Sequence, residues 1–105
     1  MDDCIFCKVI AGAFGTEFLF EDENCVIFRD INPKAKTHLL IVPRKHIRSV
    51  AHVEEADKSN MGNLIWAAKK IGEKLKLPAY KLQIHVGKEA GQEIFHLHVH
   101  LMSNF

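Results

Sequence analysis

The chain has 105 residues and an almost balanced charge, with 14 Lys and Arg against 13 Asp and Glu. This length supports a single packed core, so we predict one domain over residues 1–105. The balanced charge argues against proteins that bind nucleic acid or anionic membranes through broad electrostatics. No apolar run approaches the roughly 18 residues of a membrane span, and the acidic start lacks a secretory signal. Three cysteines form no disulfide framework, which favours a reducing cytoplasm.

The hydrophobic pattern predicts short strands and two helices along the chain. In chain order these are a short helix over 4–11, strands over 17–21, 25–29 and 37–43, a long helix over 54–77, and strands over 80–86 and 95–102. Tight links join most of the strands, and one long helix follows the third. We therefore expect an antiparallel five-stranded α+β domain with this helix on one face. The helix buries the stripe Met61, Leu64, Ile65, Ala68, Ile71 and Leu75.

The segment "FHLHVHLMSNF" (95–105) places His96, His98 and His100 at alternate positions. On a strand, alternate side chains share a face, and the aliphatic residues between them face the core. A merely solvated face has no need of three imidazoles. One zinc ion cannot bind all three either, because they span about 13 Å along a strand. Catalysis fits better, since imidazole is a nucleophile and a proton carrier near neutral pH. The glycine-bearing loop upstream, "GKEAGQE" (87–93), offers backbone N–H groups for a phosphate.

Two separate segments resemble the signatures of the histidine-triad family. "HLHVHLM" (96–102) is similar to the triad itself, and "AGQEIFHLHVHL" (90–101) extends that similarity. "FRDINPKAKTHLLIVPRKHI" (28–47) resembles the other signature segment, and the likeness runs from Cys4 to Met102. Within the family the chain looks closest to the Hint-like nucleoside phosphoramidases. The resemblance implies a homodimer with an antiparallel five-stranded fold that binds a purine nucleotide and cleaves at its α-phosphorus.

The resemblance also assigns catalytic roles. It implies that His98 attacks the α-phosphorus and forms a covalent nucleotidyl-histidine, which water then hydrolyses. His100 and His38 are expected to form a relay behind this nucleophile. Gln92 is expected to steer the leaving group or the attacking water.

The nucleotide-binding residues carried over from the family surround this centre. The resemblance implies that Asp30 accepts hydrogen bonds from both ribose hydroxyls, and that the main chain from Gly91 to Glu93 binds phosphate oxygens. His85 stands where the family usually has an amide near the phosphate, and a protonated histidine there would add positive charge. The expected purine walls, which also suit a plain core, are Ile5, Phe6, Val9, Phe28 and Ile31.

A second constellation is "CIFC" (4–7), a CxxC pair that alone is a weak signal for redox chemistry or zinc. A redox CxxC usually follows a strand, and none is predicted before it. The chain resembles bacterial members of the family, in which two cysteines and two histidines bind a metal. The resemblance implies structural zinc at Cys4, Cys7, His46 and His96. The alternative is two free thiols. Cys25 is predicted to be a core thiol, and His52 an exposed residue.

The sequence is compatible with three functions. The first is a phosphoramidase that acts on AMP- or GMP-linked amines, the second is a dinucleoside polyphosphate hydrolase of the same superfamily, and the third is a nucleotide-binding dimer with little catalysis. The set His38, Gln92, His98 and His100 favours an enzyme, because a pure binder needs no nucleophile. Trp66 falls outside the core stripe of the long helix. The resemblance places this helix at the twofold axis of a homodimer, beside the paired strands 80–86, so we expect Trp66 at that contact.

Overall fold

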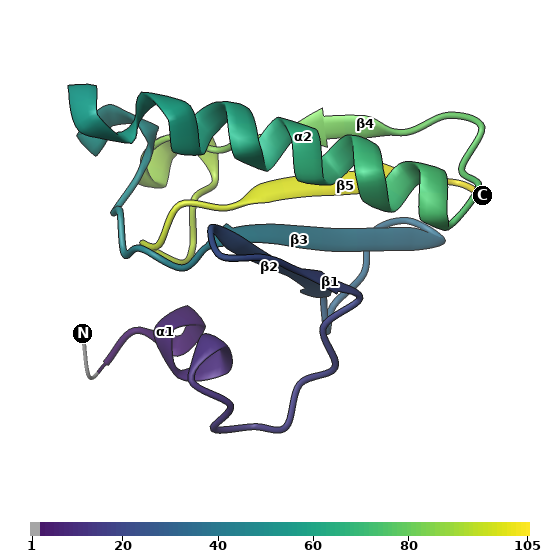
Figure 1. Cartoon of the computed structure of the whole chain (residues 1–105), viewed down its shortest axis with the longest axis horizontal. Helices are drawn as coiled ribbons and strands as arrows, with labels where there is room; N and C mark the ends of the chain where they lie inside the picture. Colours follow the sequence, from purple (N-terminus) through teal and green to yellow (C-terminus); the bar gives the residue numbers. More distant parts are fainter. Residues whose placement is uncertain (1–2) are drawn as a thin grey trace.

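The computed structural model describes residues 3–105 and contains one antiparallel sheet with a helix on each face (Figure 1). The strand order is β1-β2-β3-β5-β4. This arrangement confirms the predicted α+β fold. The helices and strands are α1 (Ile5–Ile10), β1 (Phe20–Glu21), β2 (Cys25–Arg29), β3 (Thr37–Pro43), α2 (Lys58–Lys74), β4 (Lys81–Gln83) and β5 (Val99–Ser103), with 3-10 turns η1 (Val50–His52), η2 (Glu55–Asp57) and η3 (Lys88–Ala90).

The long helix α2 covers one face of the sheet and forms the larger core with it (Figure 1). Leu64, Ala68 and Ile71 are buried there as predicted. The prediction for Ile65 is wrong, because this side chain is 48% exposed and Ala67 is buried in its place. At about 100° per residue, position 67 lies nearer to Leu64 around the helix than position 65 does. The sheet side of this core includes Cys25, Ile27, Leu39, Ile41, Leu97, Val99 and Leu101.

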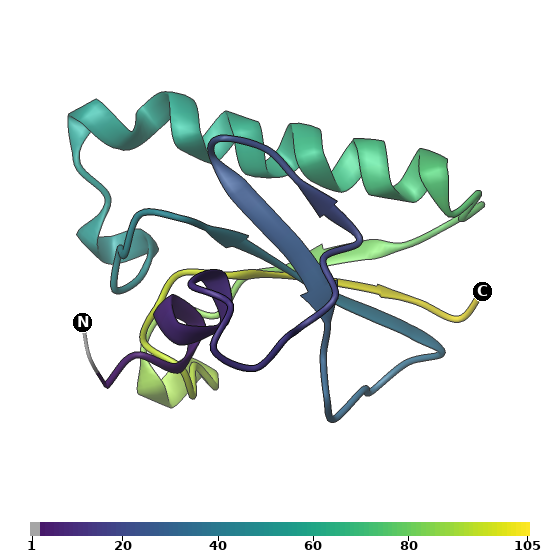
Figure 2. The same ribbon diagram turned by 60° about the horizontal axis from the view of Figure 1, so that its bottom comes forward.

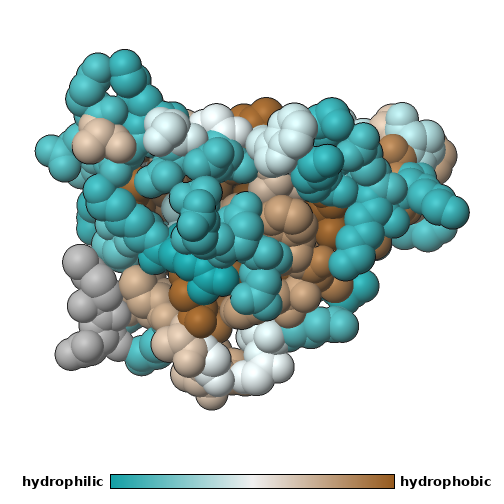
Figure 3. All heavy atoms as spheres, in the orientation of Figure 1, coloured by the Kyte–Doolittle hydropathy of each residue, from teal (hydrophilic) through white to brown (hydrophobic). Residues whose placement is uncertain are grey.

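The short helix α1 lies on the opposite face of the sheet (Figures 1 and 2). It begins where the Cys4 sulfur accepts a hydrogen bond from the Cys7 backbone N–H at 3.3 Å, which caps its first turn. Its buried residues Phe6 and Val9 pack with a smaller cluster from β2 and β3, namely Val26, Phe28, Leu40 and Val42. Figure 3 shows hydrophobic residues reaching the surface around this helix. Because α1 is short, it leaves part of this face open.

The strands β1, β4 and β5 are shorter than predicted. For β4 and β5 the reasons lie in the loops next to β5. β5 begins only at Val99, because His96 lies in a bend and the Leu97 N–H bonds to the Ile47 carbonyl at 2.6 Å. β4 pairs with β5 over three residues before the chain turns at Gly87, which has φ +92°. The alternation still holds, since Leu97 and Val99 are buried under α2. β1 is the third short strand.

α2 is the longest helix in the described part of the chain, and neither it nor another helix there has the length and apolar character of a membrane span. It ends at Lys74, earlier than predicted, and Lys76 then adopts a left-handed conformation with φ +55°. Cys25 is fully buried and His52 is exposed, as predicted.

Candidate active site

A cavity of about 870 Å³ opens on the face of the sheet that carries α1. This volume is typical of small-molecule sites, which span about 300–1,000 Å³. All five expected purine walls line it, with apolar side chains from α1, β2 and the loop after β2. The other predicted residues that line the cavity are Asp30, His38, His85, Gly91, Glu93, His98 and His100.

The His98 imidazole is held in one orientation by its neighbours. Its Nδ1 lies 2.7 Å from the His96 carbonyl oxygen. A carbonyl only accepts hydrogen bonds, so Nδ1 carries the proton and Nε2 keeps a free lone pair. The Phe6 ring packs edge-on at 5.1 Å between centroids. Burial lowers the pKa of His98, which keeps the ring neutral and nucleophilic.

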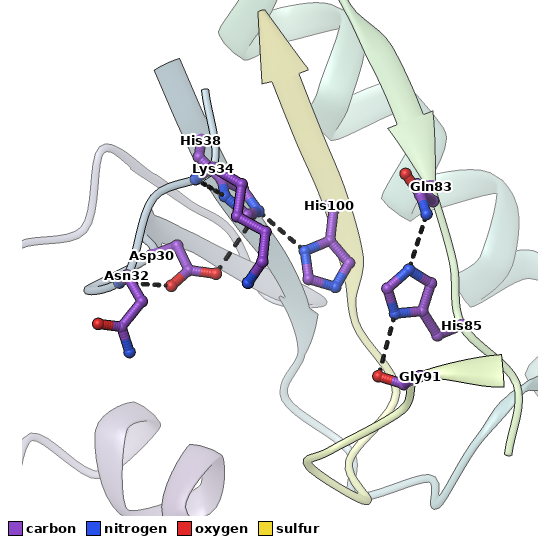
Figure 4. Close-up of polar contacts among 8 residues, drawn as sticks. All are labelled: Asp30, Asn32, Lys34, His38, Gln83, His85, Gly91 and His100. Carbon is purple, nitrogen blue, oxygen red and sulfur yellow. Dashed lines mark hydrogen bonds and ion pairs between the residues drawn. The ribbon is translucent and has the colours of Figure 1, made fainter. Parts of the chain in front are cut away.

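His38 and His100 form a hydrogen-bonded pair (Figure 4), and the ring of His100 lies 5.0 Å from that of His98 between centroids. The Lys34 backbone N–H donates to Nδ1 of His38 at 3.0 Å. The proton of neutral His38 is therefore on Nε2, which donates to Nδ1 of His100 at 2.9 Å. His100 then carries its own proton on Nε2, the nitrogen left for the cavity. Burial, followed by the neighbouring His98, His85 and His38, lowers the pKa of His100 to about 4.

Asp30 completes this group, and its geometry favours a proton relay over a metal site. One Asp30 oxygen lies 3.5 Å from Nε2 of His38, and the other accepts the Asn32 N–H at 2.8 Å. Ligand atoms of Asp30, His38 and His100 all lie within 4.8 Å of one another, close enough to share an ion. A metal would need the Nε2 lone pair of His38. The Lys34 N–H instead forces the proton onto that atom.

His85 connects β4, the loop before β5 and the relay (Figure 4). Its Nε2 lies 2.8 Å from the Gln83 amide nitrogen, and its Nδ1 lies 3.3 Å from the Gly91 carbonyl. Its ring packs against His100 with centroids 4.9 Å apart and the planes tilted by 32°. His85 therefore lies against His100 on the wall of the cavity.

Gln92 is the predicted site residue that the structure does not bring to the cavity. Its side chain is 3% exposed and bonds only to the backbone. Its oxygen accepts the Gly87 N–H at 2.9 Å, and its nitrogen donates to the Arg48 and Ile94 carbonyls at 2.9 and 3.1 Å. An amide offers one acceptor and two donors, which suits a loop whose backbone has no sheet partner. Gln92 therefore braces the loop that presents Gly91 to the cavity.

The four predicted zinc ligands converge below the cavity. The Cys4 and Cys7 sulfurs lie 3.3 and 3.6 Å from Nδ1 of His96, and the Cys7 sulfur lies 3.5 Å from Nδ1 of His46. The two histidine nitrogens are 3.2 Å apart. Tetrahedral zinc with ordinary Zn–N and Zn–S bonds separates its ligands by about 3.3–3.8 Å. Four of the six separations among these atoms are thus close to the edges of such a tetrahedron, and all four atoms lie within 4.8 Å of one another.

The surroundings of these atoms also suit a cation. The Nε2 of His96 donates to the Pro43 carbonyl at 2.8 Å, so its Nδ1 lone pair faces the sulfurs. Burial and the nearby Cys4 raise the pKa of Cys7 to about 11. A cation between the sulfurs offsets the cost of forming thiolates there and satisfies the facing lone pairs. The residues therefore fit structural zinc.

Six polar residues line the cavity that the sequence analysis did not assign to it, namely Thr16, Arg29, Asn32, Lys34, Lys81 and Gln83. A signal for two of them was present. Residues 81, 83 and 85 alternate along a predicted strand and so share one face with His85. Lys34 lies in a loop, where no such periodicity applies.

Comparisons with known proteins identify the family of the chain. The HIT domain model matches residues 13–105. Protein HitA of Neisseria gonorrhoeae is 40% identical over 103 residues, which cover 97% of this chain and 96% of HitA. A HIT family hydrolase from Clostridium thermocellum has a TM-score of 0.96 at 36% identity, covering 100% of this chain and 93% of that one. A histidine triad nucleotide-binding protein from Candida albicans has a TM-score of 0.84 at 30% identity, covering 94% and 73%. The chain therefore belongs to the HIT domain family.

Proposed function

We propose that the protein hydrolyses purine nucleoside 5′-phosphoramidates, in which AMP or GMP is linked to an amine. The observation that carries this proposal is the pairing of a free Nε2 lone pair on His98 with an Nε2–H on His100 in one cavity. The similarity to a protein named as a HIT family hydrolase and to one named as nucleotide-binding supports both halves of the proposal.

The cavity offers separate surfaces for the parts of a nucleotide. Phe6, Phe28 and Ile31 provide apolar contacts for the purine. Asp30 is placed to accept hydrogen bonds from both ribose hydroxyls, which a carboxylate does with its two oxygens. The backbone from Gly91 to Glu93 supplies phosphate contacts next to the nucleophile.

The proposed reaction has two displacements at phosphorus. In the first, Nε2 of His98 forms a bond to the α-phosphorus as the P–N bond breaks. The amine leaves with the bonding electrons and takes the proton from Nε2 of His100, and the negative charge left on His100 is balanced by the positive charge that His98 gains in its bond to phosphorus. In the second, water attacks phosphorus and gives a proton to His100. The bond to His98 then breaks, and the nucleoside monophosphate is released.

Zinc has a structural role in this proposal. When bound, it would link α1 to the segment before β5 through Cys4, Cys7, His46 and His96. His96 is also the residue whose carbonyl orients His98. Zinc-binding thiols must be reduced, so we place the protein in the cytoplasm. We also propose that residues 1–105 form a single domain.

The direct test is His98→Asn. We expect turnover of an adenosine 5′-phosphoramidate to fall by several orders of magnitude, because the nucleophile is lost. AMP affinity should change little, since a lost hydrogen bond costs only about 1 kcal/mol. Stopped assays and calorimetric titration measure the two quantities. Near-normal turnover in this variant would contradict the assigned nucleophile.

Hydrolysis of dinucleoside polyphosphates is the second candidate function. It uses the same histidines, and the cavity lysines Lys34 and Lys81 suit a leaving group that is itself a phosphate. Parallel incubation with an adenosine phosphoramidate and a diadenosine polyphosphate separates the candidates. Faster turnover of the second compound would favour this function. Inertness toward both would favour a nucleotide-binding protein with little catalysis.

A further inference from the structure

We infer that Lys34 and Lys81 make the site selective for substrates whose leaving group carries negative charge. This inference rests on the proposed function, because it concerns the group that the reaction expels. The shared chemistry is an anion close to the scissile bond, either the carboxylate of an amino acid linked through its nitrogen or a phosphate of a polyphosphate.

The position of the leaving group follows from the two histidines. In an in-line displacement, the nucleophile and the leaving atom lie on opposite sides of the phosphorus. The leaving atom must also meet the Nε2–H of His100, the proton donor. The rest of the leaving group therefore lies on the side of the cavity formed by His100 and its neighbours.

Lys34 is anchored beside this position. Its backbone N–H bonds to Nδ1 of His38 at 3.0 Å, and His38 bonds in turn to His100. Figure 4 shows its side chain extending from this anchor across the view between Asp30 and His100, and all three residues line the cavity. The ammonium group is thus tethered to the relay pair by the backbone.

Lys81 approaches the same position from the other side. On β4 it is paired with Met102, two residues beyond His100 on β5, while Gln83 is directly opposite His100. Diagonal neighbours of this kind lie about 7–8 Å apart, which a lysine side chain spans easily. Lys81 lines the cavity on the same face of β4 as Gln83, and His85 lines it from the segment after β4. The two lysines therefore flank His100.

The other charges of the cavity leave these lysines available. Arg29 is paired with Glu17 at 3.2 Å, whereas within residues 3–105 neither lysine forms an ion pair. Asp30 is engaged by Asn32 and His38. Glu93 also lines the cavity, in the loop that the proposed function assigns to the phosphate rather than to the leaving group. Lys34 and Lys81 thus bring two positive charges to the side of the cavity where the leaving group lies.

A series of three adenosine phosphoramidates tests the inference. Their leaving amines are glycine, glycinamide and ethylenediamine, which are similar in size and carry a negative, no and a positive side-group charge. We expect kcat/KM to fall in that order, with glycine favoured over glycinamide by at least about fivefold, as two exposed charge contacts allow. The preference should shrink in about 0.5 M salt, because exposed charges are screened.

Variants then assign the preference to the lysines. The double variant Lys34→Gln/Lys81→Gln should bring the glycine-to-glycinamide ratio close to one. Lys36→Gln, from the same loop but outside this cavity, is the matched control and should keep the wild-type ratio. A diadenosine polyphosphate is measured alongside these compounds. Faster turnover of the polyphosphate than of the glycine compound, with that advantage lost in the double variant, would identify phosphate as the anion.

The outcomes separate this inference from the proposed function. Equal turnover of all three amine compounds by the wild type would overturn the lysine selectivity and leave the phosphoramidase standing. A charge preference that survives in the double variant would also overturn it. Turnover of the polyphosphate alone, with the same dependence on the lysines, would support the inference while rejecting the phosphoramidase. Inertness toward every compound would overturn both.

Discussion

The protonation pattern of the candidate site is set largely by backbone groups. The His96 carbonyl places the His98 proton on Nδ1, and the Lys34 N–H places the His38 proton on Nε2. Because backbone groups cannot change their donor or acceptor character, these tautomers do not depend on mobile side chains. In the proposed reaction, the fold thus prepares both the nucleophile and the proton donor before a substrate binds.

The lowered pKa of His100, about 4, predicts how stability depends on pH. In the unfolded chain this histidine binds a proton below about pH 6.5, whereas the folded protein binds it only near pH 4. Its contribution to the free energy of unfolding should therefore fall as the pH drops through that window. Between pH 7 and pH 4, we expect the melting temperature of His100→Asn to fall by less than that of the wild type, as measured by calorimetry.

The exposed His52 gives the control for this experiment, as His52→Asn. Acid release of zinc would lower the stability of all three proteins, so the difference between their slopes is the relevant quantity. Parallel slopes for the wild type and His100→Asn would contradict the assigned shift in pKa.

At the residue level, periodicity predicts positions better than it predicts roles. The alternation of residues 96–101 correctly predicted that Leu97, Val99 and Leu101 enter the core, although His96 and His98 are buried as well and the strand begins only at Val99. Gln92 shows the limit, since the sequence does not reveal whether an amide in a loop turns toward a ligand or toward nearby backbone groups. Its contacts with Gly87 and Arg48 depend on how the loop folds back on the η1 region.

At the level of elements, β2 and β3 begin and end where the sequence predicts, because they are central strands with long apolar runs. The edge strand β4 is shorter than predicted, since only β5 holds it in place. Helix α1 unites two predictions that the sequence kept apart. It carries Cys4 and Cys7 toward the metal ligands and Phe6 toward the cavity.

This dual role of α1 leads to a prediction about zinc. Purified protein should contain about one zinc ion per chain, and Cys4→Ser/Cys7→Ser should lose it and melt at a lower temperature, because metal binding contributes to folding. Nucleotide affinity should fall as well, since α1 forms part of the cavity wall. Elemental analysis, thermal melting and AMP titration measure these effects.

Cys25→Ala is the matched control, because Cys25 is a core thiol that is not among the four metal ligands. This variant should keep its zinc even though the loss of a buried sulfur lowers stability. Zinc-free wild-type protein, with a melting temperature that does not respond to added zinc, would show that the four residues form no metal site.

At the scale of the whole molecule, an apolar surface runs along the edge strand β4 and the outer side of α2. β4 is the last strand of the sheet, so one side of its backbone is unpaired within this chain. Exposed large apolar residues gather on these elements and the chain beside them, namely Ile65, Trp66, Tyr80, Leu82, Ile84 and Val86. An open edge next to apolar side chains is typical of a surface that another chain covers.

We predict that a second copy of the chain covers this surface, with Trp66 near the twofold axis. Trp66 is 54% exposed and lies on the side of α2 away from the core. The charged ends of Lys69 and Lys70 lie over its ring. Trp66→Glu would bring two like charges together at a symmetric contact, so light scattering should show a shift from dimer toward the 12.0 kDa monomer. Phe14→Glu, an equivalent change at an exposed aromatic residue beside the cavity, should leave the dimer intact. A wild-type monomer, or a dimer unaffected by Trp66→Glu, would place the contact elsewhere or exclude it.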